Sequence, residues 1–271
     1  MVTASLVLYH NRQKDIDNVL KSVLSSRIDV LQIVDHSSDD KFATLTNLSK
    51  RIFYVRTEND GYGKGHNIGF AESQKILQSK YHIIINPDIC FEPSAIDSLI
   101  SYMDKHNDVG LVMPKIFYPN GEFQYLCKML PKPSDIFIRQ FAPKCIKDKN
   151  DIRYALKTAD FEAEMDIPSL SGCFMFFRTE SFEKVGGFDT RFFMHFEDID
   201  ITRRIGEFAR TVYYPGASII HAHEAAHKKS FRMMLVGLQS AIKYFNKWGW
   251  LFDRKRKILN HLAEKYLQKI V

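Results

Sequence analysis

Two acidic residues that follow apolar segments are the first candidates for chemistry in this chain. Asp88 comes just after the β-rich run at residues 81–85, and Asp35 lies within a similar run at 30–37. Parallel strands place their carboxyl ends at one edge of a sheet, so both carboxylates are expected there. Such a pair suits a hard divalent cation, which prefers oxygen ligands and often completes its shell with substrate phosphates.

A second group of acids, Glu197, Asp198 and Asp200, lies in the segment FFMHFEDIDITRR. Taken alone, these residues are also typical of a solvated helix start, because negative side chains are stabilised by the positive end of the helix dipole. Asp88 has a similar alternative, since Asp is a frequent turn former. The residue types therefore leave both interpretations open.

Histidines form a third candidate group. His221 and His223 alternate at the end of the β-rich segment 213–223, with His227 close behind, so two imidazoles are expected on one strand face. They suit a metal site, and they are equally typical of hydrogen-bonded structural histidines. The Gly-rich stretch NDGYGKGHN at 59–67 matches neither GxGxxG nor the P-loop pattern.

The elements that must position these groups follow a β–α rhythm. Apolar patterns predict strands at 4–10, 30–37, 52–58 and 81–85, with helices at 16–24, from the Gly-rich stretch to about 79, and from 93 onward. This alternation predicts an α/β fold with a Rossmann-like, mostly parallel central sheet covered by helices on both faces.

Beyond residue 107 the pattern changes. Strands are expected at 109–119 and 172–178. The segment between them, 120–168, is irregular and rich in Pro and Lys, which predicts a flexible wall over a binding site. Helical spacing resumes after residue 228 and predicts two helices interrupted near Gly249.

Composition limits the classes open to the chain. Its 271 residues, 45 % of them hydrophobic, suit a substantial core. The four cysteines lie far apart without a CxxC pair, so neither a zinc site nor a disulfide framework is indicated, and a reducing cytosol is expected. No signal peptide is indicated, and no segment approaches the ~20 apolar residues of a membrane span.

Positive charge is concentrated at the C-terminal end. Residues 228–271 hold eleven Lys and Arg against two acids, a net charge of +9, so residues 1–227 carry −3 of the total of +6. We expect a main domain at 1–227 and a basic amphipathic helical tail at 228–271. The tail could lie on an anionic bilayer, or pack as helices with a solvated basic face. Nucleic acid is not expected, because the acidic main domain would repel a phosphate backbone.

Five segments, in order, carry a family resemblance over most of residues 1–223: VDHSSDD (34–40), NDGYGKGHNIGFAES (59–73), IIINPD (83–88), SGCFMFFRTESFEKVGGFDTRFFMHFEDIDITRRI (171–205) and YYPGASIIHAH (213–223). With them the chain resembles the inverting GT-A glycosyltransferases of family 2, in particular the rhamnosyl- and galactofuranosyltransferase branch. The combination GGFD…FF…EDxD…R is highly specific to that family.

The resemblance implies a pocket for a pyrimidine nucleotide. Asp35 would hydrogen-bond the base, and His36 stands where relatives usually have Asn. The family's DXD motif appears as Asn86-Pro87-Asp88, with one carboxylate in place of two. Further residues would line the base pocket or lie beside the ribose and diphosphate: Tyr9, His10, Asn11, Ser37, Gly63, Lys64, Asn67 and Asn86.

The resemblance also assigns roles to the reacting groups. Asp88 would bind Mg²⁺ or Mn²⁺ between the two phosphates, and His221 would complete the metal shell, as in some relatives. Asp198 would be the catalytic base and Glu197 would help to bind the acceptor. An inverting transfer needs a base on the face of the sugar opposite the leaving diphosphate, while a metal neutralises charge on that leaving group.

The expected function is transfer of a sugar, with rhamnose as one candidate, from a dTDP- or UDP-sugar to a saccharide or lipid-linked saccharide of the cell envelope. The expected location is the cytoplasm, or the inner face of the membrane if the tail binds lipid. Two alternatives stay open. A sugar nucleotidyltransferase would need a Gly-rich phosphate loop where this chain has YHNRQKD. A non-catalytic glycan-binding protein is favoured only by Asn86 in place of a carboxylate.

Overall fold

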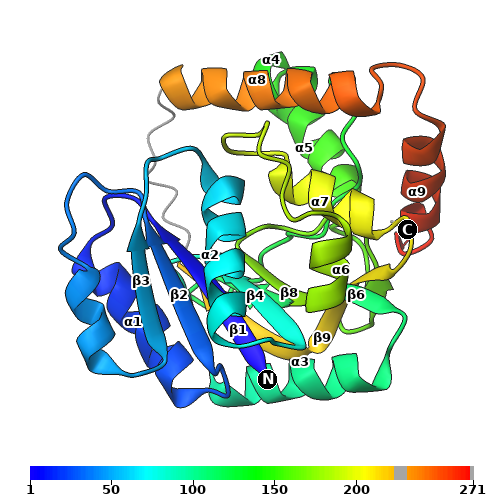
Figure 1. Ribbon diagram of the computed structural model, residues 1–271. Helices are drawn as coiled ribbons and strands as arrows, with labels where there is room; N and C mark the ends of the chain where they lie inside the picture. Colours follow the sequence, from blue (N-terminus) through cyan, green and yellow to red (C-terminus); the bar gives the residue numbers. More distant parts are fainter. Residues whose placement is uncertain (223–230, 269–271) are drawn as a thin grey trace.

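A mixed β-sheet flanked by helices forms the body of the protein (Figure 1). The computed structural model describes residues 1–222 and 231–268. Within them the strand order is β3-β2-β1-β4-β8-β6-β9-β5, and β7 pairs with β9. The α/β fold predicted from the sequence is confirmed.

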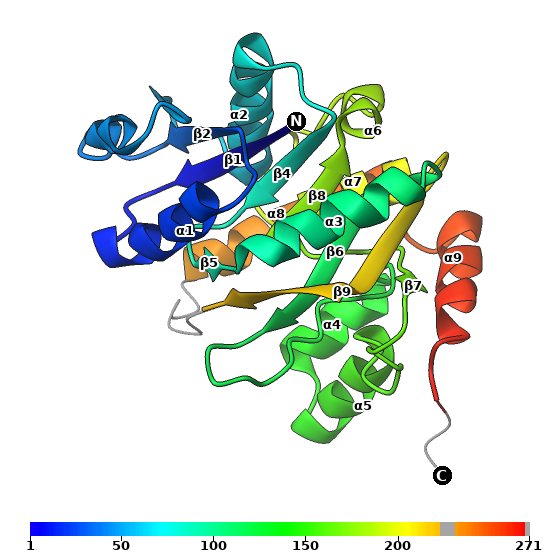
Figure 2. The same cartoon turned by 90° about the horizontal axis from the view of Figure 1, so that it is seen from below.

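The N-terminal half is parallel, as the alternating pattern predicts. β1 pairs with β2 and β4, and β2 pairs with β3, all in parallel. Helices α1 and α3 lie on one face of these strands, and α2 packs on the other (Figure 2). The elements are β1 (Val2–Leu8), α1 (Gln13–Ser25), β2 (Val30–Asp35), η1 (Ala43–Leu48), β3 (Ile52–Arg56), α2 (Tyr62–Ile76), β4 (Tyr81–Ile85) and α3 (Pro93–Lys105).

Apolar spacing explains these elements. β2 and β4 are buried along their whole length, which is typical of strands covered by helices on both faces. In α1 the predicted apolar stripe faces the sheet, with Ile16, Val19, Leu20 and Val23 all at most 3 % exposed. Burial of both strand faces leaves the strand ends as the places where polar side chains reach solvent.

The C-terminal half changes strand direction. β8 (Phe174–Arg178) runs antiparallel between β4 and β6 (Val109–Phe117), and β9 (Arg210–His221) runs parallel to β6. The remaining elements are β5 (Ile89–Cys90), β7 (Met165–Asp166), α6 (Thr179–Lys184) and α7 (Glu197–Ile205). Because β8 is antiparallel to β4, the residues just before β8 lie beside the carboxyl end of β4.

The segment 120–168 differs from its prediction. It contains two helices, α4 (Pro133–Phe141) and α5 (Lys144–Tyr154), so the expectation of an irregular wall was wrong. Pro133 occupies the first turn of α4, and the Asp135 carboxylate accepts the backbone N–H of Lys132 at 2.7 Å, which defines the helix start. α5 reads KCIKDKNDIRY, and so polar a helix has little apolar periodicity to reveal it.

The tail forms two helices as predicted, α8 (Phe231–Trp248) and α9 (Arg254–Glu264). They are separated at Gly249, whose φ of +101° favours glycine. The inner face of α8 joins an apolar cluster with the segment that precedes α7: Phe192, Phe196, Ala241, Tyr244 and Phe245. No helix in the described ranges is both long and apolar enough to cross a bilayer.

A buried ion pair fastens the tail to α7. The guanidinium of Arg203 donates to both carboxylate oxygens of Asp253 at 2.6 and 2.7 Å, and the two side chains are only 2 % and 3 % exposed. Asp253 also caps α9 by accepting the N–H of Arg256 at 2.9 Å. Removing one partner of such a pair leaves an uncompensated buried charge.

Asp253→Asn tests this attachment. We expect the free energy of unfolding to fall by about 3–5 kcal/mol, because Arg203 keeps its charge and loses its partner. Urea denaturation followed by tryptophan fluorescence measures the change. Glu207→Gln removes the exposed partner of Lys255 and serves as the control, with an expected loss below about 1 kcal/mol. Equally small losses in both variants would contradict the buried attachment.

Candidate active site

The carboxyl ends of β1 and β2 bring the predicted base-pocket residues together. Asp35 is fully buried, and its Oδ1 accepts the N–H of Ser37 at 2.9 Å while its Oδ2 accepts the hydroxyl of Tyr54 at 3.1 Å. The loop after β1 closes on the same point, because the His10 N–H donates to Ser37 Oγ at 2.9 Å. Tyr9 and Asn11, which were also predicted to line the base pocket, lie on either side of His10. The Tyr9 N–H donates to Asn11 Oδ1 at 2.8 Å.

A groove opens beside this cluster at the ends of β2 and β3. Its volume is 460 Å³, and its lining consists of His36, Ser37, Ser38, Arg56, Thr57, Glu58 and Asn59. His36 Nδ1 lies 3.0 Å from the hydroxyl of Thr57. Burial lowers the pKa of His36 despite the charge of Asp35, so its imidazole is neutral at pH 7. The groove therefore offers hydrogen-bonding groups next to the Asp35 carboxylate.

The Gly-rich segment forms the start of α2 and gives its predicted residues different surroundings. Lys64 is exposed and pairs with Asp60. Gly63 packs so closely that a Cβ there would lie 2.8 Å from Cβ of Phe188. Asn67 holds the same Phe188, because its Nδ2 donates to the carbonyl and its Oδ1 accepts the N–H, both at 2.8 Å. Its amide thus fastens the GGFD turn to α2, and its contact with a nucleotide stays a prediction.

Tyr62 lies at the centre of the site. Its hydroxyl is 2.9 Å from Oδ1 of Asn86, at the end of β4, and 2.6 Å from the carbonyl oxygen of Gly172, just before β8. Burial raises the pKa of Tyr62 well above its ordinary value. Nearby carboxylates raise it further, and they come from both candidate acidic groups: Glu197, Asp198 and Asp88. The two groups, far apart in sequence, therefore both act on the pKa of one hydroxyl.

The start of α7 holds Asp198 in place. The preceding residues His195 and Phe196 have φ of +70° and +71°, a left-handed conformation that costs energy in non-glycine residues and is concentrated at functional sites. Asp198 Oδ2 accepts the N–H of Gly172 at 3.0 Å, and its Oδ1 accepts the N–H of Ile199 at 2.8 Å. Both bonds fix the orientation of the carboxylate.

Glu197 has different surroundings. Its side chain is buried, and its Oε2 has no hydrogen-bond partner among the described residues. Burial, followed by the charge of Asp198, raises the pKa of Glu197 to about 8. Glu197 is therefore protonated at neutral pH and can donate a hydrogen bond from a position beside the charged Asp198. A buried acid with a raised pKa beside a second carboxylate is typical of an active site.

Asp88 and His221 meet because β5 pairs with β9. Ile89 is opposite His221 in that pair, and the N–H of Ala222 donates to the carbonyl of Asp88 at 2.8 Å. The two side chains approach to 3.3 Å between His221 Nε2 and Asp88 Oδ2. Gln124 Oε1 lies 2.9 Å from His221 Nδ1 and fixes the ring. Burial lowers the pKa of His221, but hydrogen bonds to Asp88 and Cys173 outweigh it and raise the pKa to about 10.

The donor set at Asp88 and His221 fits a divalent cation with few protein ligands. Ligands at right angles around an ion with bonds of about 2.1 Å lie about 3 Å apart, close to the 3.3 Å between the two donor atoms. Gln124 holds Nδ1, which leaves Nε2 directed at Asp88, and a cation bound there would displace the proton that this pairing keeps on Nε2. The described part of the chain holds no group of three or more metal-ligating side chains, so phosphates and water would complete the shell. His223 and His227 lie outside the described residues.

Three contributors to the site carry weak sequence signals. Tyr62 lies among glycines that are typical of turns, Gln124 lies in the segment predicted to be irregular, and His195 precedes the acidic group at 197–200. Burial lowers the pKa of His195, although Asp198 acts in the opposite direction. An aromatic residue with a polar tip inside a Gly-rich segment is the one signal that could have indicated Tyr62.

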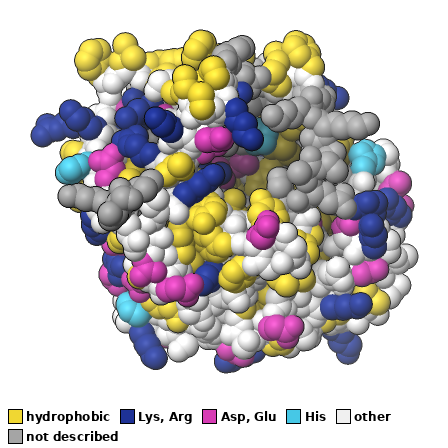
Figure 3. Space-filling view, turned by 180° about the vertical axis from the view of Figure 1, so that it is seen from behind, with side chains coloured by type: hydrophobic (Ala, Val, Ile, Leu, Met, Phe, Trp, Pro, Cys, Tyr) yellow, Lys and Arg dark blue, Asp and Glu magenta, His cyan; other side chains and the backbone are white. Residues whose placement is uncertain are grey.

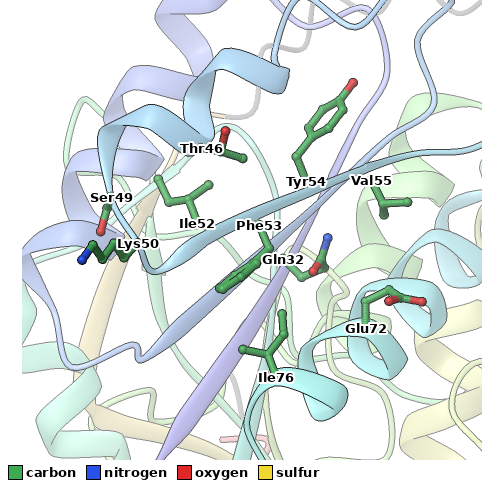
Figure 4. A pocket seen from close by; sticks show the side chains of 10 residues that line it. All are labelled: Gln32, Thr46, Ser49, Lys50, Ile52, Phe53, Tyr54, Val55, Glu72 and Ile76. Carbon is green, nitrogen blue, oxygen red and sulfur yellow. The ribbon is translucent and has the colours of Figure 1, made fainter.

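A larger groove of 620 Å³ lies elsewhere, along the edge strand β3. Figure 4 shows its lining side chains, which come from β2, β3, the region of η1 and the end of α2. None of the predicted site residues lines it. The candidate active site is therefore defined by the contacts among Tyr62, Gly172 and Asp198 and not by this groove.

The comparisons with known proteins agree with this geometry. The model of glycosyl transferase family 2 matches residues 6–186, and the chain belongs to this family. It is 29 % identical over 206 residues to the N-acetylglucosaminyl-diphospho-decaprenol L-rhamnosyltransferase of Mycobacterium tuberculosis, over 67 % of this chain and 66 % of that protein. The chain thus spans slightly less than two thirds of the length of this relative.

Two further proteins are similar. Rhamnosyltransferase WbbL of Escherichia coli K12 is 27 % identical over 205 residues, which cover 71 % of this chain and 74 % of WbbL. The crystal structure of GalNAc-T7 with UDP, GalNAc and Mn²⁺ matches with a TM-score of 0.66 at 12 % identity, over 91 % of this chain and 48 % of that one. At that identity the structural match supports the GT-A fold and nothing finer.

Tyr62→Phe tests the central hydroxyl. The variant removes the single proton that Tyr62 offers to a buried carbonyl and a side-chain amide oxygen, so we expect the free energy of unfolding to fall by about 1–3 kcal/mol. Guanidinium denaturation provides the measurement. Tyr9→Phe removes a hydroxyl from a side chain that is 55 % exposed, and it should stay within about 0.5 kcal/mol of the wild type. If both variants matched the wild type, the Tyr62 hydroxyl would not join β4 to β8.

Glu197→Gln tests the buried acid through pH. Because the pKa of Glu197 rises from 4.5 to about 8 on folding, the native state keeps a proton that the unfolded chain releases, and stability falls as pH rises through this window. Gln cannot ionise, so the variant should gain stability relative to the wild type between pH 5 and pH 8. Melting temperatures at both ends measure this, with the exposed Glu180→Gln as control. A parallel pH dependence in Glu197→Gln and the wild type would refute the buried, protonated state.

Proposed function

We propose that this chain is an inverting glycosyltransferase that moves a sugar, rhamnose in particular, from a dTDP- or UDP-sugar to a saccharide acceptor of the cell envelope. The observation that carries the proposal is that Tyr62 and Gly172 join the end of β4, which leads to Asp88, to the carboxylate of Asp198. A leaving-group site and a base must share one cleft for this reaction. The names of the mycobacterial relative and of WbbL support rhamnose as the sugar.

The donor nucleotide occupies the ends of β1 and β2 in this proposal. Asp35 and Ser37 hold the pyrimidine base, with the loop of Tyr9, His10 and Asn11 against it. Since Asp35 already accepts two hydrogen bonds, it is oriented before the nucleotide arrives. The ribose and diphosphate lie near the start of α2 and the end of β4, beside the other predicted donor-binding residues: Gly63, Lys64, Asn67 and Asn86.

Asp88 and His221 hold the cation, Mg²⁺ or Mn²⁺. When bound, it neutralises charge on the leaving nucleoside diphosphate. Gln124 orients His221, and the pairing of β5 with β9 sets the position of Asp88. Asn86 is restrained through Tyr62, so the end of β4 stays next to the diphosphate.

Asp198 is the base that accepts the proton of the acceptor hydroxyl. Two backbone N–H groups, of Gly172 and Ile199, hold its carboxylate in a fixed orientation. Its remaining lone pairs are available for the incoming hydroxyl. Glu197, protonated beside it, donates a hydrogen bond to another acceptor oxygen, which distinguishes its role from that of Asp198.

The acceptor is a lipid-linked saccharide in this proposal. The mycobacterial relative is named for a diphospho-decaprenol substrate, which supports this class of acceptor. In this proposal residues 1–227 form the catalytic domain, and the basic tail, 228–271, attaches the protein to the inner face of the membrane. A sugar nucleotidyltransferase is a poorer fit, since the turn after β1 contains no Gly-rich loop.

Asp198→Asn tests the proposal. With dTDP-rhamnose and a lipid-linked acceptor, we expect turnover to fall by about 10²–10⁴-fold, because the amide cannot accept the proton. The dissociation constant of the donor, measured by calorimetry, should stay unchanged, because Asp198 acts on the acceptor side. Asp97→Asn is the control, since Asp97 makes only an exposed pair with Arg27. Unchanged turnover in Asp198→Asn would rule out its role as base.

A further inference from the structure

The outer face of α8 and the turn after it present an apolar surface. Exposed hydrophobic residues recur on α8 at intervals of three and four, and the turn adds three more, of which Phe252 is 96 % exposed. Figure 3 shows hydrophobic side chains gathered along the top edge of the molecule, where α8 lies in Figure 1. We call these residues the apolar face: Phe231, Met234, Leu235, Leu238, Ile242, Trp250, Leu251 and Phe252.

The exposed charged side chains of the segment that carries the apolar face are positive. Between residues 231 and 257 the single acid is Asp253, which is buried against Arg203. Lys255 pairs with an exposed acid, Glu207, outside this segment. The exposed cations are Arg232, Lys243, Arg254, Lys255 and Lys257. The surface of this segment therefore combines large apolar side chains with positive charge and exposes no carboxylate of its own.

We propose that the apolar face inserts into the headgroup region of an anionic lipid bilayer, with the surrounding cations against lipid phosphates. Interfacial helices bind through apolar area together with attraction to anionic lipids, and both features are present. A second copy of the chain is a poorer partner, because a two-fold contact would bring the same cations face to face. The inference rests on the proposed function for its purpose, which is to reach a lipid-linked acceptor.

The opposite face of α8 holds the elements that carry the proposed base. Ser240 Oγ donates to the carbonyl of Met194 at 2.8 Å, in the segment before α7. Trp248 Nε1 donates to Asp200 on α7 at 2.8 Å, and Lys247 pairs with the same Asp200 at 2.7 Å. Packed helices lie about 8–10 Å apart, so a bilayer-bound α8 would keep α7 one helix layer from the lipid.

A hollow in the surface next to α8 agrees with an orientation in which α8 faces the bilayer (Figure 3). In Figure 3 a hollow with acidic side chains lies just below the hydrophobic edge. An acceptor anchored in the bilayer that holds α8 would approach the protein from this side. Docking through α8 would thus set the distance between the lipid surface and the start of α7, in addition to raising the local concentration of acceptor.

Vesicle cosedimentation tests the proposal. We compare the full chain on vesicles of phosphatidylcholine alone and of phosphatidylcholine with phosphatidylglycerol. We expect binding to the anionic vesicles that weakens at high salt, and weakening by at least about tenfold in Leu238→Gln with Ile242→Gln. The matched control is Leu48→Gln with Ile76→Gln, which replaces an equally exposed Leu and Ile on another part of the surface and should bind like the wild type.

Three outcomes would overturn the proposal. The first is binding to neither vesicle, and the second is equal binding by the two double variants. The third is a dimer in light scattering that the Leu238 and Ile242 substitutions abolish, with no vesicle binding, which would assign the face to a second copy. Vesicle binding requires neither a nucleotide-sugar donor nor turnover. Transferase activity of the same variants is measured separately with a soluble acceptor, so failure of membrane binding and failure of the proposed activity are distinguishable.

Discussion

The hydroxyl of Tyr62 is the contact on which the rest of the site depends. It lies between Asn86, at the end of a parallel strand, and the carbonyl of Gly172, at the start of an antiparallel one. This change of strand direction brings residues about a hundred positions apart to one edge of the sheet. Asp88 comes just after β4, and Asp198 accepts a hydrogen bond from the N–H of Gly172, just before β8. One buried contact therefore fixes both sides of the proposed cleft.

The tail contributes to the same arrangement from the other side of α7. Asp200 and Arg203 lie on α7 just after the proposed base, and each is buried with a partner from the tail. Unpartnered, these charges would be costly in the interior. The tail thus completes the surroundings of α7 with its inner face, while its outer face stays apolar and basic. A single helix, α8, links the proposed acid–base chemistry to the proposed lipid contact.

Sequence reasoning predicted the parts that follow from local pattern. Strand ends in the N-terminal half could be predicted from apolar runs, which gives the positions of Asp35 and Asp88, and helical spacing gives α8 and α9. The position of Asp198 depends on the antiparallel β8 and on the left-handed His195 and Phe196, which no periodicity reveals. α5 was missed because its residues are nearly all polar, and tertiary contacts decide such a helix.

Anomalous diffraction at the manganese edge, from crystals grown with dTDP and Mn²⁺, tests the central claim most directly. We predict one manganese peak about 2.2 Å from Asp88 and from Nε2 of His221, with the diphosphate on the ion and the carboxylate of Asp198 facing the same cleft. Manganese bound away from Asp88, or a nucleotide seated in the groove along β3, would contradict the assignment of this site.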